Sequence, residues 1–285
     1  MANHTIVSCY LMGGLGNQLF QVFTTLAYGI KNSKKVLFSY SEVLTTGIER
    51  PTYWSNFLKC LSPYVTKESI DLQIQHSEQG FRYEPIDAYD KNTILYGYFQ
   101  SYLYFEEYRT ILFSLIRVTN QKHDIREKFF ELLSFHTNMV SMHFRMGDYK
   151  TKQDYHPIMP YEYYKNALAH ILSKRDYCNV LYFCEKEDIG DVDLIINRLK
   201  IMFGSKVEFV LVDDTIPDWQ QMLLMSCCKD NIIANSSFSW WGAYFNQNVE
   251  QIVCYPSVWF GHKIAHNTID LFPPSWTKVD FSHRQ

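Results

Sequence analysis

The sequence has little charge and no long apolar run. Only 20% of its 285 residues are charged, and the formal net charge of −3 lacks the basic excess with which proteins bind DNA or RNA. The apolar run near the N-terminus is far too short to span a bilayer, and no basic stretch precedes it as in an export signal. We therefore expect a cytoplasmic protein without nucleic-acid partners or a membrane span. Peripheral association with a membrane and the oligomeric state stay open.

Several chemical motifs are missing as well. The seven cysteines lack CxxC spacing and the ten histidines form no HExxH pattern, so the sequence shows no zinc site. Several cysteines lie inside apolar runs, where a thiol packs as a small hydrophobic group, and this is typical of a reducing compartment. No GxSxG nucleophile elbow is present, which leaves acyl-enzyme hydrolysis without a visible nucleophile.

The residues that are present suit a packed α/β fold. Hydrophobic residues make up 47% of the chain and aromatic residues 16%, which is enough for a sizeable core. Short β-rich runs alternate with amphipathic stretches, which is the pattern of a parallel sheet wrapped by helices. The predicted strands are residues 6–11, 36–40, 94–99, 140–144, 180–184, 207–212, 232–234 and 252–255. The predicted helices are residues 17–30, 105–116, 125–135, 161–173, 192–203, 219–228 and 239–246.

The pattern predicts two domains. From residue 140 onward strands and helices alternate strictly, which indicates one doubly wound unit that binds ligands beyond the carboxyl ends of its strands. Between residues 41 and 92 the pattern breaks down into polar and aromatic sequence, which we interpret as an irregular insertion facing a substrate. We place the N-terminal domain with this insertion at residues 1–137 and the C-terminal domain at residues 138–285.

The first candidate site is the segment GGLGNQLFQ, which lies between a predicted strand and a predicted helix. A dinucleotide fingerprint fails because Leu19 stands where a third small residue is needed, and a P-loop fails because no Gly-Lys-Ser/Thr follows. Gly14 and Gly16 can let the backbone approach a ligand closely, while Asn17 and Gln18 can present amides at a helix N-terminus. An ordinary strand-to-helix turn capped by an asparagine explains the segment equally well.

The second candidate is HFRMGD, at the end of a predicted strand. Side chains alternate along a strand, so we expect His143 and Arg145 on one face and Phe144 on the other. The planar guanidinium of Arg145 suits bidentate binding of a phosphate, and Asp148 can orient Arg145 or hydrogen-bond to His143. Taken alone, the motif fits a structural Arg–Asp pair better than a phosphate site.

The third candidate is NSSFSWWGAYF, where hydroxyl groups meet the start of a predicted helix. Unpaired N–H groups and the helix dipole make such a start an anion site. Ser236, Ser237 and Ser239 add hydroxyl donors to it. The bulky aromatic residues of the segment suit core packing instead, and these are Trp240, Trp241 and Phe245.

Acidic residues offer weaker candidates. Asp213 follows a predicted strand at the same sheet edge, where it can meet a base or a ribose. Asp191 and Asp193 form a DVD pattern able to hold a divalent cation. They also open a predicted helix, however, and capping with the helix dipole explains them more simply. The sequence therefore predicts no metal site.

The three motifs, in this order and at this spacing, make the chain similar to the α-1,2-fucosyltransferase family over nearly its whole length. The resemblance implies two facing Rossmann-like domains of the GT-B type, with the donor mainly on the C-terminal domain. It implies an inverting, metal-independent transfer of L-fucose from GDP-β-L-fucose to a hydroxyl of an acceptor glycan, with an α-1,2 link to galactose. No cofactor is implied beyond the nucleotide sugar itself.

The same resemblance gives roles to individual residues. Arg145 matches the arginine on the donor pyrophosphate, His143 matches its neighbour, and Asn17 matches the asparagine near the sugar. The segment that matches the cradle of the β-phosphate comprises Ser236, Ser237, Phe238 and Ser239, and Asn235 just before it is a further candidate for donor binding. The candidates for a general base follow the second motif, and they are Asp148, Asp154 and His156.

The chain departs from the family pattern His-x-Arg-Arg-x-Asp, because Met146 stands at the second arginine. We expect Met146 to face away from Arg145, so that the change affects packing or a nearby charge rather than the phosphate contact. Three alternatives stay open. They are a weakened or non-catalytic nucleotide- or carbohydrate-binding relative, a transferase with another linkage or donor, and a metal-dependent transferase using Asp191 and Asp193.

Overall fold

The computed structural model describes residues 5–134 and 137–281, which form two compact units. Unit 1 contains the chain up to Thr119 together with His266–Pro273. Unit 2 contains Asn120–Ala265 and the chain from Pro274 onward.

Two helices follow unit 1 in the chain, and nearly all of their residues belong to unit 2. α3 (Val118–Lys128) is followed by α4 (Phe130–Ser134), and the buried ammonium of Lys122 in α3 donates to the carbonyl of Phe245 at 2.8 Å. The sequence placed the boundary between residues 137 and 138, next to residues 135–136, which lie outside the described part of the chain. The end of the helix predicted at residues 125–135 falls there too.

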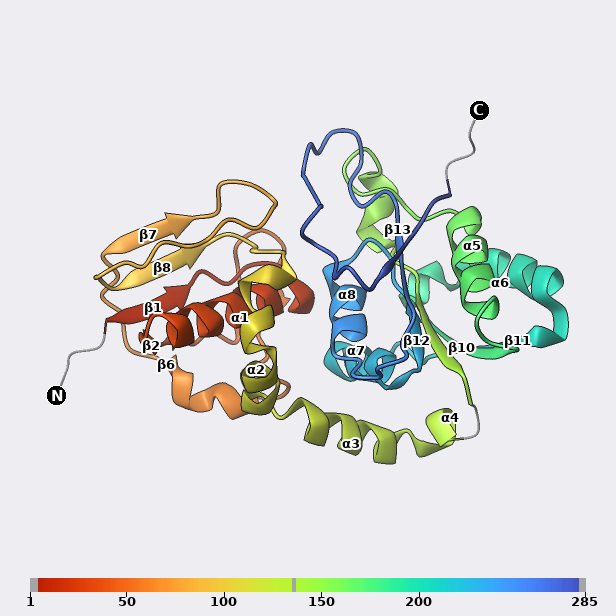
Figure 1. Ribbon diagram of the computed structural model, residues 1–285, viewed down its shortest axis with the longest axis horizontal. Coiled ribbons are helices and arrows are strands. Elements are labelled where there is room, and N and C mark those ends of the chain that lie inside the picture. The colour runs from red at the N-terminus through yellow and green to blue at the C-terminus, as the bar shows by residue number, and fades with distance from the viewer. Residues whose placement is uncertain (1–4, 135–136, 282–285) are drawn as a thin grey trace. The chain divides into compact units, whose positions relative to one another are not determined.

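Unit 1 is built on a four-stranded parallel sheet in the order β2-β1-β8-β7 (Figure 1). Its helix α1 is buried along most of its length, and its Phe20 and Phe23 pack against the ring of Phe105 at centroid distances of 5.9 and 5.6 Å. The strands and helices that form unit 1 are β1 (Ile6–Cys9), α1 (Leu15–Lys31), β2 (Lys35–Val36), β7 (Ile74–Ser77), β8 (Thr93–Tyr96) and α2 (Arg109–Leu115), with short 3₁₀ helices at Lys59–Tyr64, Tyr102–Tyr104 and Glu106–Tyr108.

Part of the predicted insertion is core rather than substrate-facing surface. Tyr53, Trp54 and Phe57 are buried, and the ring of Trp54 lies 5.3 Å from that of Phe38. These bulky rings pack because two short pairs of strands fold the insertion back on the sheet. The pairs are β3 (Phe38–Ser39) with β6 (Val65–Thr66), which is parallel, and β4 (Val43–Leu44) with β5 (Arg50–Pro51), which is antiparallel.

Unit 2 is a doubly wound α/β unit, as the alternating pattern predicts. Its six parallel strands lie in the order β11-β10-β9-β12-β13-β14, so the order reverses between β9 and β12. In Figure 1 the strands run between α7 and α8 on one side and α5 and α6 on the other. The strands are β9 (Met139–His143), β10 (Cys178–Phe183), β11 (Val207–Leu211), β12 (Asp230–Ile232), β13 (Val253–Pro256) and β14 (Thr277–Val279). The helices are α5 (Tyr161–Leu172), α6 (Ile189–Phe203), α7 (Asp218–Cys227) and α8 (Ser237–Tyr244).

Aromatic and sulfur-containing side chains fill the core of unit 2. The ring of Phe144 lies 4.2 Å from that of Tyr164, and Met146 joins the same apolar cluster. Trp240 and Trp241 are fully buried, which confirms their prediction as core residues. Met146 therefore occupies an apolar site, where a charged arginine would need a partner.

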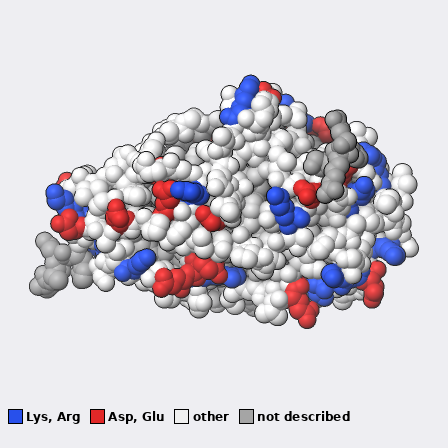
Figure 2. Space-filling view, turned by 45° about the horizontal axis from the view of Figure 1, so that its top comes forward, with Lys and Arg blue, Asp and Glu red and all other residues white. Residues whose placement is uncertain are grey.

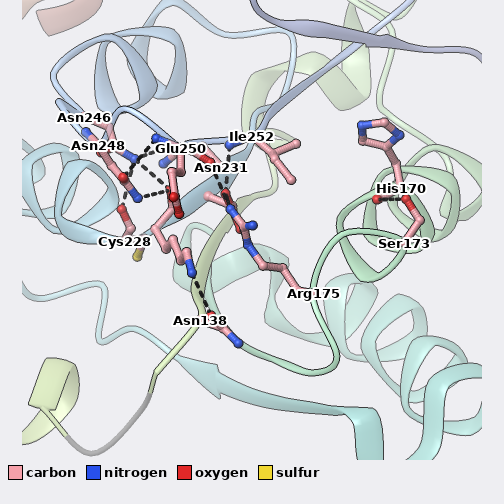
Figure 3. Close-up of polar contacts among 12 residues, drawn as sticks. Asn138, His170, Ser173, Arg175, Cys228, Asn231, Asn246, Asn248, Glu250 and Ile252 are labelled. Atoms are coloured by element: carbon pink, nitrogen blue, oxygen red, sulfur yellow. Dashed lines mark hydrogen bonds and ion pairs between the residues drawn. The ribbon is translucent and has the colours of Figure 1, made fainter.

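A network of polar side chains lies at the amino ends of the strands in this sheet, where β12 and β13 begin (Figure 3). Arg175 forms a bidentate ion pair with the fully buried Asp230 at 3.0 and 3.1 Å and also donates to the carbonyl of Glu250. Asn246 donates to the side chain of Asn231 at 2.9 Å. The buried carboxylate of Asp230 and the buried amide of Asn231 thereby have partners, which is what a polar group needs inside a protein.

The surface carries charges of both signs. Figure 2 shows acidic and basic side chains interspersed over the face in view rather than gathered by sign. Within residues 5–134 and 137–281, no helix is long and apolar enough to cross a membrane. The same residues contain no cluster of three or more histidine, cysteine or acidic side chains that could hold a metal ion.

Candidate functional site

Two of the three sequence motifs meet at one point of unit 2. β9 ends at His143 and leads into Arg145, while β12 ends at Ile232 and leads into Asn235 and α8. β9 and β12 are neighbours at the position where the strand order reverses. In open α/β sheets this is where ligands bind, beyond the carboxyl ends of the strands. The fold therefore places both motifs at the expected ligand edge.

Arg145 is held by partners from two chain segments. Its Nη2 donates to Oδ1 of Asp148 and its Nη1 donates to Oε1 of Glu185, which follows β10. Its guanidinium also lies over the ring of Tyr149, 4.8 Å from the centroid. The side chain of Arg145 is only 18% exposed, so its position and plane are well defined. Asp148 was expected either to orient Arg145 or to hydrogen-bond to His143, and the structure shows the contact with Arg145.

The turn after Arg145 requires glycine. Gly147 has a φ of +37°, and a Cβ there would come within 2.5 Å of Oε2 of Glu185. The N–H of Gly147 donates to the buried carboxylate of Asp188 at 2.7 Å, and Lys150 pairs with that same carboxylate at 2.7 Å. The loop is thus fastened to the start of α6, which keeps Arg145 at the sheet edge.

His143 connects the two motifs. It is buried, and its ring centroid lies 5.5 Å from that of Phe238 at the start of α8. Burial, helped by the positive charge of Arg145, lowers the pKa of His143 to about 3, so the ring is neutral at physiological pH. Its Nδ1 is buried and has no hydrogen-bond partner in the described part of the chain.

The start of α8 is a helix N-terminus with its own cap. The hydroxyl of Ser236 accepts from the N–H of Phe238 at 3.3 Å, while Ser237 is the first helical residue and partly exposed. The hydroxyl of Ser239 is buried and donates to the carbonyls of Ala234 and Ser236. The groups that can attract an anion at this end are therefore the N–H groups of the first turn with the helix dipole, rather than Ser239.

Asn235 ties neighbouring loops to the site. Its Nδ2 donates to the carbonyls of Pro157 and Trp259 at 2.9 and 3.1 Å, and Tyr149 donates to its backbone carbonyl at 3.4 Å. Its Oδ1 is buried without a partner among the described residues. Together with Nδ1 of His143, it is one of two buried polar atoms near this edge of the sheet that have no partner in the described residues.

The three predicted base candidates have different surroundings. The carboxylate of Asp148 bonds to Arg145 and lies 3.4 Å from Nζ of Lys152. Asp154 pairs with Lys263 at 2.7 Å, and this hydrogen bond and charge lower the pKa of the carboxyl. The ring of His156 stacks on that of Tyr149 at a centroid distance of 4.8 Å.

The acidic residues at other positions are engaged locally. Asp213 is exposed and accepts from the N–H and hydroxyl of Thr215, which lowers its pKa. Asp191 pairs with Lys150 at 2.8 Å, and Asp193 accepts from the hydroxyl of Tyr182 at 3.5 Å.

The glycine loop lies in unit 1 and opens α1 there. Gly14 is the N-cap of α1, and Gly16 lies in its first turn. Asn17 accepts from the side chain of Gln100 at 2.8 Å. Gln18 is buried, and its amide donates to the carbonyls of Gly13 and Pro51 at 2.9 Å each, so this side chain holds the loop together.

Glu185 and Tyr149 are the site residues that sequence reasoning missed. Glu185 lies 40 residues from Arg145 in the chain, but it follows the strand that neighbours β9. The rule that the carboxyl ends of parallel strands meet at one edge was the available signal.

Comparisons with known proteins give the family. A model of glycosyl transferase family 11 matches residues 3–280. Among curated relatives, the O-antigen biosynthesis glycosyltransferase WbnK of Escherichia coli is 29% identical over 65% of this chain, and the match spans only 60% of that relative's length. An alpha-1,2-colitosyltransferase of Escherichia coli is 27% identical over 97% of this chain and 99% of its own length.

A solved structure supports the fold. A variant of FUT1 from Arabidopsis thaliana in complex with GDP has a TM-score of 0.51 at 11% identity, covering 86% of this chain and 69% of that one. The predicted α/β chain with Rossmann-like domains of the GT-B type is thereby confirmed. With nearly all of its length matched, the chain belongs to glycosyl transferase family 11, a family of glycosyltransferases of the fucosyltransferase type.

Proposed function

We propose that this glycosyltransferase moves L-fucose from GDP-β-L-fucose to a hydroxyl of an acceptor glycan, with inversion and with an α-1,2 link to galactose. The observation that carries the proposal is that β9, which leads into Arg145, and β12, which leads into α8, are neighbours where the strand order reverses. Both features attract a pyrophosphate, and they come from segments about 90 residues apart in the chain. GDP as the nucleotide is supported by the GDP complex of FUT1.

The charges suggest how the donor bond breaks. As the sugar leaves GDP, negative charge grows on the oxygen of the β-phosphate. Arg145 supplies a guanidinium and α8 supplies the N–H groups of its first turn, so donors from two directions stabilise this charge. A single pre-oriented donor of this kind typically lowers a barrier by about 3 to 4 kcal/mol. We assign the phosphate contacts to Arg145, Ser236 and Ser237.

We further propose that no metal ion takes part. Asp191, the first carboxylate of the DVD pattern, is paired with Lys150, and Asp193 lies inside α6. Arg145 then supplies the positive charge that stabilises the departing diphosphate. Full transfer in excess chelator is the expected result, and activity that returns only with added magnesium or manganese would overturn this part of the proposal.

The surroundings of the acidic residues favour His156 as the base. Asp148 and Asp154 each bind a cationic side chain, which occupies carboxylate oxygens that a general base would need for the acceptor hydroxyl. The ring nitrogen of an imidazole is a suitable proton acceptor for general-base catalysis. His156 lies beside Tyr149 in the loop that Asn235 fastens to the site.

A second donor is favoured by a specific relative. The alpha-1,2-colitosyltransferase matches almost the whole chain. Colitose differs from L-fucose by the loss of the 3-hydroxyl, so GDP-colitose fits the same phosphate contacts. The two donors therefore differ only in what the site offers the third carbon of the sugar.

The experiment that tests the proposed function is a panel of nucleotide sugars with simple galactosides as acceptors. Released GDP gives the rate, and NMR of the product gives linkage and anomeric configuration. We expect turnover with GDP-fucose or GDP-colitose and an α-1,2 product. A protein that binds GDP but releases none from any GDP-sugar would be the non-catalytic relative, and would overturn the proposal. We expect the reaction to use no cofactor and to take place in the cytoplasm.

A further inference from the structure

Three partly exposed tyrosines gather at the carboxyl edge of the unit 1 sheet. Tyr10 directly follows β1, Tyr96 ends β8, and Tyr98 lies two residues beyond it. Between 38% and 43% of each residue is exposed, so these rings are not part of the core. We call Tyr10, Tyr96 and Tyr98 the tyrosine platform.

The register of the sheet brings these rings together. Cys9 pairs with Leu95 in the parallel ladder, and the N–H of Tyr10 extends the ladder by donating to the carbonyl of Leu95 at 3.0 Å. Tyr10 and Tyr96 are therefore cross-strand neighbours, with ring centroids 5.5 Å apart. Tyr98 lies two residues beyond Tyr96, and its N–H donates to the carboxylate of Glu78 at 2.8 Å.

The tyrosine platform lies where the order of the unit 1 sheet reverses. β1 and β8 are neighbours in the sheet although β2 and β7 lie between them in the chain. The carboxyl ends of parallel strands at such a position are the usual place of a ligand. The loop from β1 into α1, with Gly14 and Asn17, starts from the same edge.

Polar groups lie on the chain segments that carry or follow these tyrosines. The hydroxyl of Tyr10 is 2.6 Å from that of Thr46, and the amides of Asn17 and Gln100 are joined at 2.8 Å. The carboxylate of Glu78 accepts from the N–H groups of Tyr98 and Phe99 at 2.8 and 3.1 Å. The edge thus offers flat apolar faces with hydroxyl, amide and carboxylate groups beside them.

We propose that the tyrosine platform binds a sugar ring of the acceptor glycan, an inference that rests on the proposed function. A pyranose presents C–H groups on its faces and hydroxyls around its rim. The faces of the tyrosine rings can pack against the C–H groups, and the polar groups of the same segments can hydrogen-bond to the hydroxyls. The carboxylate of Glu78 lies at the backbone of Tyr98 and repels a phosphate, so the chemistry favours a neutral sugar over the nucleotide.

The test separates acceptor binding from donor binding. In Tyr96→Ala and Tyr10→Ala, we expect the KM for the galactoside to rise at least about fivefold, while the KM for the donor and the affinity for GDP stay unchanged. Tyr96→Phe keeps the ring face and should recover most of the acceptor affinity. The control is Tyr177→Ala, an equally exposed tyrosine of unit 2. Thermal melting confirms that each variant is folded.

An acceptor KM that stays unchanged in both alanine variants would overturn the inference and leave the proposed function intact. A change in GDP affinity instead would also overturn it, since the platform would then hold the nucleobase.

A second readout does not depend on turnover. Saturation-transfer NMR with methyl β-galactoside should show contact to the wild-type protein and lose it in Tyr96→Ala. If no donor is turned over but this contact is seen and lost, the platform stands and the proposed function fails. If the wild-type protein shows no galactoside contact, the inference is wrong.

Discussion

Glu185 forms an ion pair with Arg145 at the edge of the unit 2 sheet, through Oε1 and Nη1. Asp148 takes the other terminal nitrogen, so both ends of the guanidinium fork carry a carboxylate partner. An arriving pyrophosphate must therefore share or displace one of these carboxylates. Glu185 is the easier one to displace, because its side chain is 55% exposed whereas Asp148 also bonds to Lys152.

The first prediction concerns Glu185. In Glu185→Gln the competing negative charge is removed, so we expect GDP to bind about two- to fivefold more tightly, in line with the small free energy of an exposed ion pair. Isothermal titration calorimetry measures this directly. Glu187→Gln removes an exposed charge two residues away and should leave GDP affinity unchanged. Weaker binding in Glu185→Gln would show that Glu185 chiefly positions Arg145.

The second prediction concerns Arg145 itself. In Arg145→Ala we expect kcat to fall by about 10² to 10³, because the charge on the departing phosphate loses its main donor. Arg145→Lys restores the charge but not the planar fork, so it should recover only a small part of the rate. A near-normal rate in Arg145→Ala, with Lys186→Ala as the exposed control, would show that another group binds the phosphate.

The fold of unit 2 could be predicted from the sequence because its strands are short apolar runs separated by amphipathic helices. The predicted strand at 180–184, for example, appears as β10 (Cys178–Phe183). Unit 1 was harder. Strands of two residues such as β3 and β6 leave no periodicity, and the burial of Trp54 against Phe38 depends on contacts that no local pattern encodes.

The candidate site shows the same division. The alternation of side chains along β9 predicted that Phe144 and Arg145 face opposite ways, and Phe144 is indeed in the core while Arg145 lies at the sheet edge. Met146 packs in the apolar cluster, as expected for a residue that faces away from Arg145. That the segments of His143 and Phe238 share one edge follows from the rule for parallel strands, whereas the contact between the two rings depends on β9 and β12 being neighbours, which the sequence does not give. The sequence predicts Ser239 as a hydroxyl donor to an anion, but in the helix this hydroxyl is buried and donates to the carbonyl of Ser236.

The third prediction is a dependence of stability on pH. His143 has a pKa of about 3 in the folded protein, because it is buried, against about 6.5 in the unfolded chain. Between these values the unfolded state binds more protons, so stability falls as the pH drops below about 6.5, by up to about 1.4 kcal/mol per pH unit.

Replacing His143 by glutamine removes this titration. Urea unfolding of the wild-type protein between pH 4.5 and 7.5 should therefore show a steeper loss of stability toward low pH than His143→Gln. His123→Gln removes an exposed histidine of α3 and should keep the wild-type slope. Equal slopes in all three proteins would mean that His143 is protonated in the fold.

The last prediction concerns the network at the opposite edge of the sheet. Asp230 is fully buried, and its carboxylate depends on Arg175 for its charge partner and on the N–H of Ile252 for a further hydrogen bond. In Arg175→Met an unpaired charge remains inside the protein, so we expect unit 2 to lose about 3 to 5 kcal/mol of stability. Adding Asp230→Asn removes that charge and should recover part of the loss, while Lys174→Met, an exposed change in the same loop, should have little effect.

GDP affinity of the folded protein should stay unchanged, because the network lies at the amino ends of the strands and Arg145 at their carboxyl ends. If Arg175→Met alone melts like the wild-type protein, Asp230 must find its charge partner elsewhere.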